Sequence, residues 1–205
     1  SASDTTPPVT MEPAPGLRVQ LGRQLFATMP EMAADFVARP GEGEHVFDFC
    51  RRLRLGETPE EAITLMAFAL QPRPAVWWGH ECLKAAPELL TDQDRDMLAI
   101  CEAWVAEPSE ANRYIALEAG LHVAVRGPGA WLALAAGWAS GSMAPEGLPP
   151  ALVPMFAIGR ALNAGVLTAL ARVAQDKRRR MLDHYVGMAE VLAKFRRTKH
   201  ARLVV

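Results

Sequence analysis

Apolar residues recur along most of this chain every three or four positions, which is the spacing of one face of an α-helix. Residues 17–55 fit two or three short helices, the last of which places Val46, Cys50 and Leu53 on one side and arginines on the other. Strand signals are scarce, because Val and Ile rarely alternate with polar residues. The pattern predicts an all-α protein, an irregular multi-helix bundle.

The middle of the chain, residues 58–140, alternates short apolar helices with brief links in a way typical of helical-repeat packing. We find no fixed-period self-similarity there, so repeat packing is one possibility and not a firm prediction. Two helix starts are marked by the sequence. Thr58 is predicted to cap one helix and to form a capping box with Glu61, and Thr91 is predicted to cap the next but one.

The C-terminal part predicts a long apolar helix followed by a basic one. Residues 151–174 are apolar on most of the helix circumference, which indicates burial on several sides. Arg160, Asn163 and Arg172 interrupt the stretch and argue against a membrane span. The sequence leaves open whether the basic last helix continues the apolar one or folds back on it as a hairpin.

The composition divides the chain into three segments. Residues 1–16 are rich in Pro, Ser and Thr and predict a disordered tail without an export signal. Residues 17–197 predict a single all-helical domain, since their length suits one sizeable core. Residues 198–205 predict a basic tail.

The formal net charge of −1 hides a strong asymmetry. From residue 172 onward there are ten Lys/Arg against three Asp/Glu, and the preceding residues hold the remaining twelve against twenty. Such a basic end predicts pairing with the acidic body of the same chain or with an acidic partner. The candidate partner-binding residues are Lys177, Arg178, Arg179, Arg180, Lys194, Arg196 and Arg197. Nucleic acid or an anionic membrane is a weaker alternative, because the body is acidic and no reader module is present.

The cysteine count argues against a disulfide framework. Cys50, Cys82 and Cys101 are odd in number, show no C-x-x-C spacing and lie among apolar residues. This usage is typical of a reducing cytoplasm, which is the location we expect.

The stretch AVWWGHEC, residues 75–82, gathers the most chemically suggestive side chains. His80 and Glu81 resemble the start of a zinc-binding H-E-x-x-H motif, but Lys84 stands at the second ligand position. His80 and Cys82 are two residues apart, so a helix directs them to nearly opposite sides. We therefore assign no metal, no cofactor and no catalytic residue, and we expect His80 and Glu81 to be exposed.

The two adjacent tryptophans in this stretch have two interpretations. Trp77 and Trp78 lie about 100° apart around a helix, so one can enter the core while the other packs against a neighbouring helix. Alternatively, Trp77, Trp78, His80 and Glu81 line a pocket for a small molecule or a peptide.

The segments FALQPRPAVWWGHECL and SGSMAPEGLPP carry a resemblance to a family. The first has an A-V-W-W motif after a proline/arginine turn, and the second has the pattern S-x-x-P-x-x-L-P-P. Over residues 43–172 the chain resembles an uncharacterised family of bacterial proteins, some of which are associated with type VI secretion gene neighbourhoods. The resemblance implies a helical accessory protein and supplies no active-site residue.

These observations favour a non-enzymatic, cytoplasmic interaction or adaptor protein with a protein partner, an accessory component of a bacterial secretion-type assembly. A small-ligand binder or enzyme with a tryptophan-lined pocket is the first alternative. Binding of an anionic polymer through the basic end is the second. The sequence leaves the oligomeric state and the partner open.

Overall fold

A computed structural model describes residues 12–195, and the secondary structure of this part is helical apart from three isolated β-bridges. The prediction of an all-α protein is therefore confirmed. The elements are α1 (Gly22–Thr28), η1 (Pro30–Asp35), α2 (Val46–Arg54), α3 (Glu60–Ala69), α4 (Pro72–Lys84), η2 (Pro87–Leu89), α5 (Asp92–Ala106), α6 (Glu110–Leu121), α7 (Pro128–Gly137), α8 (Met155–Arg172), η3 (Gln175–Lys177) and α9 (Arg178–Lys194).

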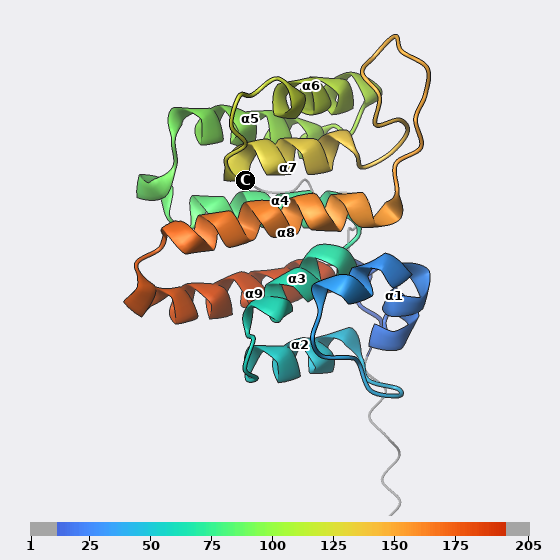
Figure 1. The fold of residues 1–205 in the computed structure, drawn as a ribbon, viewed down its shortest axis with the longest axis vertical. Helices are drawn as coiled ribbons and strands as arrows, with labels where there is room; N and C mark the ends of the chain where they lie inside the picture. Colours follow the sequence, from blue (N-terminus) through green and yellow to red (C-terminus); the bar gives the residue numbers. More distant parts are fainter. Residues whose placement is uncertain (1–11, 196–205) are drawn as a thin grey trace, which may run out of the picture.

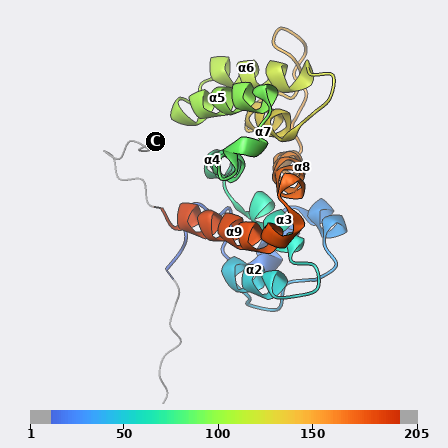
Figure 2. The same ribbon diagram turned by 90° about the vertical axis from the view of Figure 1, so that its left-hand side faces the viewer.

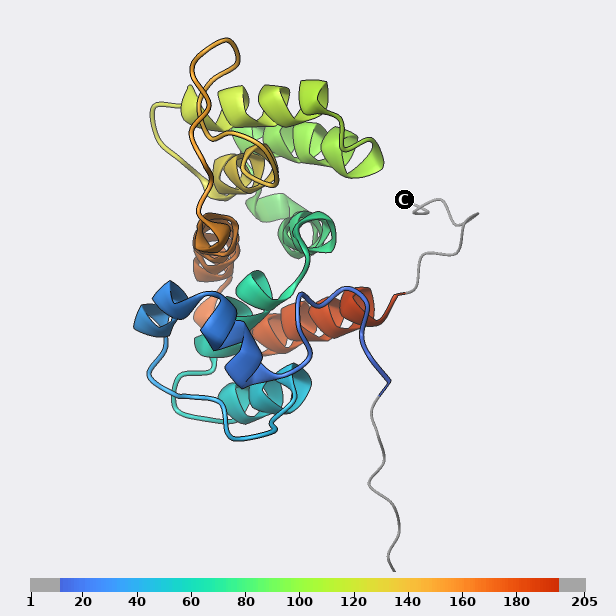
Figure 3. The same ribbon diagram turned by 90° about the vertical axis from the view of Figure 1, so that its right-hand side faces the viewer.

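The helices form stacked layers around α4 and α8, which lie side by side in the middle of the molecule (Figure 1). On one side α7 covers this pair, with α5 and α6 beyond it. On the other side α3 and α9 cover it, followed by α2 and α1. Figure 3 shows α4 and α8 nearly end-on between these two groups. The most apolar helices thus occupy the inner layers, as burial requires.

Helix α7 lies against α4, α5, α6 and α8, so the middle of the chain packs around one central helix. A stack of repeats would instead have each unit contact only its neighbours. Small residues allow this close packing. A Cβ atom at Gly137 would lie 2.5 Å from the Cα atom of Leu117, so α6 and α7 approach each other more closely than any larger residue permits.

The last two long helices fold back on each other, which answers the question that the sequence left open. The chain bends by 118° between α8 and α9. Arg178 stabilises the bend by donating hydrogen bonds to the carbonyl oxygens of Ala171 and Val173, at the end of α8. No single helix in the described part is long and apolar enough to cross a membrane; α8 and α9 meet that criterion only as a bent pair.

Ala14 and Gly16, which precede the predicted domain boundary at residue 17, already belong to the fold. Ala14 is buried, and the Gly16 N–H donates a 2.8 Å hydrogen bond to the Ala193 carbonyl at the end of α9. The Gly16 carbonyl accepts one from the Gln71 N–H, just before α4. The predictions for residues 1–11 and for the basic tail 198–205 lie outside the described residues.

One of the two predicted helix caps is confirmed and the other is wrong. Thr91 and Asp94 form a capping box at the start of α5. At α3 the N-cap is Pro59, without a side-chain cap, and the buried Glu61 carboxylate accepts a hydrogen bond from the distant Val37 N–H. This long-range contact takes the place of the predicted local one.

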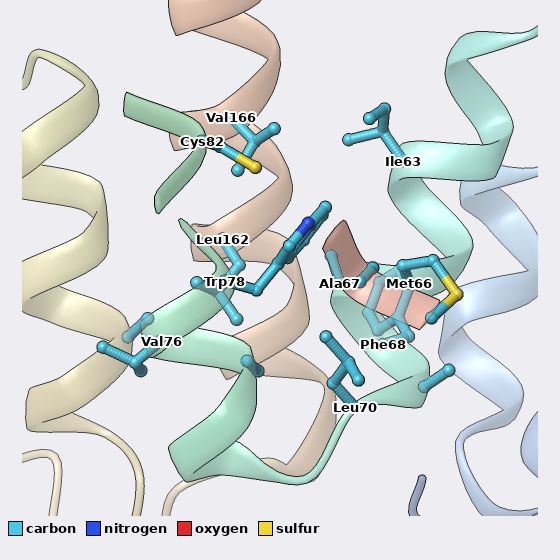
Figure 4. Close-up of a cluster of buried hydrophobic side chains, with 14 of the residues drawn as sticks. Ile63, Met66, Ala67, Phe68, Leu70, Val76, Trp78, Cys82, Leu162 and Val166 are labelled. Atoms are coloured by element: carbon cyan, nitrogen blue, oxygen red, sulfur yellow. The ribbon is translucent and has the colours of Figure 1, made fainter. Parts of the chain in front are cut away.

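The core near α4 is built around Trp78, which is fully buried. Its ring projects from α4 into the space between α8 and α3, close to Leu162 and Ala67 (Figure 4). Its Nε1 donates a 2.9 Å hydrogen bond to the Tyr185 carbonyl of α9, so its one polar atom is satisfied. Trp78 therefore joins the neighbouring helices α3 and α4 to α8 and α9, which come much later in the chain.

Candidate functional site

Helix α4 turns its other tryptophan away from this core. The helix begins with Pro72 in the first turn, where the missing N–H costs no helical hydrogen bond. Arg73 fixes this first turn against α5, since its Nε donates a 2.7 Å hydrogen bond to the Val105 carbonyl. The start of α4 is thereby held rigidly, and Trp77, one turn further on, lies half-buried on the outer side.

The Trp77 ring stacks on the His80 imidazole, with ring centroids 4.5 Å apart and planes 15° apart. His80 was expected to be exposed, and this prediction is wrong: its side chain is 1% exposed. Its Nδ1 lies 3.2 Å from a Glu81 carboxylate oxygen, and its Nε2 lies 3.3 Å from a Glu102 carboxylate oxygen on α5. The histidine is covered because Trp77 and α5 close over it, which single-helix geometry does not reveal.

This histidine and its two glutamates do not form a metal site. No group of three or more His, Cys, Asp or Glu side chains within residues 12–195 has an arrangement that could hold a metal ion. The two carboxylates approach the ring from different sides, one at each nitrogen, and do not converge on a common point beyond it. The cluster is a hydrogen-bonded, negatively charged surface feature beside Trp77.

Two hollows adjoin Trp77 along the line where α4 and α9 meet. The first has a volume of about 240 Å³ and lies where the N-terminal segment, α4, α5 and the end of α9 come together. Its main lining residues are Pro15, Pro74, Trp77, Val105, Leu192 and Phe195. The second has a volume of about 610 Å³ and lies between α4 and α9. Its main lining residues are Trp77, Glu81, His184, Gly187, Met188 and Val191.

Trp77 and Leu192 belong to both hollows, so the two form one continuous depression, which we call the Trp77 groove. Figure 2 shows α9 crossing below α4. Large apolar side chains on its α9 wall remain in water: Val191 is 69% exposed and Phe195 is 50% exposed. An open apolar surface of this kind is typical of a binding site for another chain segment.

Gly187 lies in the middle of α9 on the groove wall, and the fold gives no reason for a glycine there. A Cβ atom at this position would meet nothing within 4 Å. By contrast, a Cβ atom at Gly79 of α4 would lie 2.5 Å from a Leu132 methyl group. A glycine inside an exposed helix costs about 1 kcal/mol relative to alanine. Gly187 therefore leaves the groove wider at this point, although packing within the fold does not require a glycine there.

The structure divides the predicted pocket set Trp77, Trp78, His80 and Glu81. Trp77 and Glu81 line the groove, the buried His80 ring stacks on the Trp77 ring, and Trp78 belongs to the core. Each interpretation thus matches the position of one tryptophan, since Trp78 lies in the core and Trp77 lines the groove. Sequence reasoning missed the whole α9 wall, because only the fold brings residues 184–195 beside α4.

The predicted partner-binding cations lie at opposite ends of α9. Lys177, Arg178, Arg179 and Arg180 precede or open the helix, and Lys194 ends it, which separates the two groups by about 24 Å. Arg178 and Arg179 already donate to backbone carbonyls of α8 and α2, and Lys194 lies 5.1 Å from the Phe47 ring. Arg196 and Arg197 lie outside the described residues. The described cations thus form no single basic patch.

The three cysteines are buried and free, and one of them, Cys82, lies in α4. Burial raises the pKa of the Cys50 and Cys101 thiols to about 12, and it raises the pKa of the Cys82 thiol well above its usual value. A nucleophilic cysteine needs the opposite shift, because the thiolate is the reactive form. The thiols act here as small apolar side chains.

The S-x-x-P-x-x-L-P-P segment lies on the far side of α7, in the loop that leads to α8. Arg113, which is buried, donates to the carbonyls of Gly137 and Ser142 and pairs with Glu110. The Ser142 hydroxyl accepts from the backbone N–H groups of Ala144 and Ala151, and so closes the loop. The segment is thus anchored, but it contributes no residue to the groove.

Fold and groove together define an all-helical bundle with an open, apolar groove beside a pair of carboxylates. The chain belongs to a family of unknown function (DUF6931), whose model matches residues 49–193. No curated protein and no solved structure matches the chain. The matched region is longer than the resemblance over residues 43–172 implied, since it reaches through nearly all of α9. Helix α4 and nearly all of helix α9, which form the two helical walls of the groove, therefore lie within the region that the family model matches.

Proposed function

We propose that this protein is an interaction module that binds a segment of a partner protein in the Trp77 groove. The observation that carries this proposal is the groove itself. Trp77, Val191 and Phe195 present apolar surface to water on two helices whose opposite faces are fully used by the core. Binding such a segment would recover the free energy lost by leaving this surface exposed, about 25 cal/mol for each Å² covered.

The shape of the groove supports a chain segment more than a small ligand. Small-molecule sites enclose most of the ligand surface, whereas these two hollows are open along the line between α4 and α9. An extended or helical segment can lie along such a line and be held by successive side chains. The small-ligand alternative has no comparable support, and neither does an anionic-polymer site, since the described cations are dispersed.

The family resemblance adds the biological setting to this proposal. It suggests that the partner belongs to a bacterial secretion-type assembly and that the protein acts there as a cytoplasmic adaptor or accessory component. The charge around Trp77 supports a protein partner carrying cations, because Glu81 and Glu102 pair only with His80 among the described ion pairs. The location and the assembly are part of the proposal.

Site-specific photo-crosslinking in cells that naturally express the protein tests this proposal. A photoreactive residue at Val191 should give one discrete adduct with another protein, and Trp77→Ala should abolish that adduct. The matched control is Val37, just after η1, which is 84% exposed but lies outside the groove. Equal adducts from positions 191 and 37, or an adduct that persists in Trp77→Ala, would contradict the proposal.

A further inference from the structure

A further hollow lies between α6 and the loop that leads from α7 to α8, away from the Trp77 groove. Figure 1 shows α6 and this loop on the side of α4 and α8 that faces away from α9. The hollow has a volume of about 280 Å³ and shares no lining residue with the Trp77 groove, so it is a separate site, which we call the α6 pocket. Its main lining residues are Tyr114, Leu117, Glu118 and His122 on the α6 side, and Glu146 and Gly147 on the loop side.

The loop wall of the α6 pocket is held in place by the protein itself. Arg113 of α6 donates a 2.8 Å hydrogen bond to the Ser142 carbonyl, at the start of the loop. The Leu148 N–H donates to the Pro145 carbonyl and closes a β-turn. Within this turn Gly147 has a φ of 83°, a left-handed conformation that favours glycine. The pocket is therefore preformed, and a ligand does not have to order the loop in order to bind.

The α6 pocket carries two carboxylates, one from each wall. Neither Glu118 nor Glu146 belongs to an ion pair within residues 12–195. Arg113 lies near the pocket, with its guanidinium 4.3 Å from the centre of the Tyr114 ring. Its charge is already matched, because it donates two 2.9 Å hydrogen bonds to the Glu110 carboxylate. The pocket therefore presents a net negative charge to a ligand.

His122 adds a third polar group to the pocket lining. Its Nδ1 lies 2.8 Å from the Glu118 carbonyl oxygen, which can only accept, so Nδ1 carries the proton. In the neutral ring Nε2 is then an acceptor. Leu117 and Leu121 supply the apolar part of the lining. A ligand that fits this lining has a positive, hydrogen-bond-donating group at the end of an apolar stem.

An arginine side chain has this composition. Its alkyl stem can lie on an apolar surface, and its planar guanidinium offers five donors and no acceptor, which suits several acceptors better than the compact ammonium of lysine. The volume of about 280 Å³ lies just below the range of about 300–1,000 Å³ typical of small-molecule pockets, so it suits one side chain better than a whole ligand. Leu148 and Leu152 of the same loop are exposed and offer apolar surface to the rest of a protein partner.

We propose that the α6 pocket binds an arginine side chain of a partner protein. In this arrangement the guanidinium donates to Glu118 and Glu146, and the alkyl stem lies against Leu117 and Leu121. The pocket is a second contact surface, independent of the proposed function of the Trp77 groove. The S-x-x-P-x-x-L-P-P segment then has a role, because it holds Glu146 opposite α6.

Nuclear magnetic resonance titration of the full-length, ¹⁵N-labelled protein with N-acetyl-arginine amide tests this proposal. Both ends of this probe are blocked, as they are within a protein chain. We expect saturable shifts of the Glu118, His122 and Gly147 amide signals with a Kd on the order of 1 mM, as suits a ligand of this size. The matched neutral probe, N-acetyl-citrulline amide, has nearly the same shape and should bind at least about tenfold more weakly, because it lacks the charge.

Matched variants assign the binding to the two carboxylates. Glu118→Gln/Glu146→Gln should weaken the arginine probe at least about tenfold, since hydrogen bonds to charged groups are the stronger ones. Glu42→Gln/Glu57→Gln removes the same charge from two exposed positions on either side of α2 and should leave the Kd unchanged. Trp77→Ala should also leave it unchanged, because the groove is a separate site. The spectrum of each variant verifies that it is folded.

Two further probes distinguish a protein partner from a free small molecule. The acetylated tripeptide amide Leu-Arg-Leu should bind severalfold more tightly than N-acetyl-arginine amide, because its leucines can cover Leu148 and Leu152. Tighter binding of free arginine than of either blocked probe would overturn the assignment to a protein side chain. Equal binding of the arginine and citrulline probes, or the absence of saturable shifts at the residues that line the pocket, would overturn the site itself.

Discussion

Trp77 and Trp78 are adjacent in the chain and lie on two different faces of one helix, about 100° apart. Trp78 is fully buried between α3, α8 and α9, and its Nε1 donates to the Tyr185 carbonyl. Trp77 stacks on His80 and keeps its outer surface in the groove. The inner side of α4 therefore satisfies the requirements of folding, whereas the outer side retains an aromatic surface that folding does not use.

The largest expected effect separates the two tryptophans by stability. Trp78→Ala should lower the free energy of unfolding by about 3–5 kcal/mol, because it leaves a cavity among three helices. Trp77→Ala should lower it by less than about 1.5 kcal/mol, since much of the ring surface is already solvated. Guanidinium denaturation measures both values. Equal losses for the two variants would contradict the division of α4 into a core side and a groove side.

A control variant divides the Trp78 contribution into packing and hydrogen bonding. Trp78→Phe keeps most of the aromatic bulk but removes the indole donor to the Tyr185 carbonyl. That carbonyl lies within α9 and keeps its helical donor, so we expect a loss of about 0.5–1.5 kcal/mol for the hydrogen bond, plus a part of the packing free energy. A loss as large as that of Trp78→Ala would show that the hydrogen bond, and not the ring volume, joins α4 to α9.

A carboxylate in the core and a carboxylate beside the groove should also differ in how much they contribute to stability. Asp94 is fully buried and accepts hydrogen bonds from Arg172 of α8, the Gly129 N–H in the first turn of α7 and the Thr91 N–H. Asp94→Asn should lower the free energy of unfolding by about 2–3 kcal/mol, because Arg172 loses its charged partner. Glu81→Gln, on the groove side, should change it by less than about 0.5 kcal/mol. Urea denaturation at neutral pH compares the two.

Acid denaturation offers a further test of Asp94. Burial alone would raise the pKa of its carboxyl, but the hydrogen bonds from Arg172, Gly129 and Thr91 outweigh this and hold the pKa below its usual value. Its contribution to stability is therefore complete above the unfolded pKa of about 3.9 and is lost as the pH falls through the lower folded pKa. Between pH 5 and pH 2, stability should fall more steeply in the native protein than in Asp94→Asn. Parallel curves would contradict this role.

The helices could be predicted from the sequence because their signals are local. The spacing of Val46, Cys50 and Leu53 and the cap at Thr91 each depend on residues within one or two turns, and the structure confirms both. The predicted cap involving Glu61 failed for the opposite reason. Its carboxylate is taken by Val37, 24 residues away, and no local pattern marks that contact.

The groove could be predicted only in part, since it forms between helices about 100 residues apart. AVWWGHEC attracted attention to Trp77, but the opposite wall consists of α9, where Met188 and Val191 have the appearance of an ordinary apolar stripe. His80 was expected to be exposed. Its burial could not be predicted from its own helix, because Trp77 and Glu102 of α5 cover the ring. Arg113 shows the same limit, since its burial depends on carbonyls of the α7–α8 connection.

The last prediction concerns Gly187, where a small effect on stability has a sign that distinguishes a folding role from a binding role. Gly187→Ala should raise the free energy of unfolding by about 0.5–1 kcal/mol, because alanine favours a helix and its methyl group meets nothing. Gly137→Ala is the matched control and should lower it, because its methyl group would lie 2.5 Å from the Leu117 Cα atom. The same Gly187→Ala protein should give a weaker Val191 photo-adduct with the partner. If Gly187→Ala is more stable than the native protein but binds the partner less well, the glycine serves binding in the groove and not folding. If the variant binds the partner as well as the native protein does, the role of this glycine in the groove is wrong.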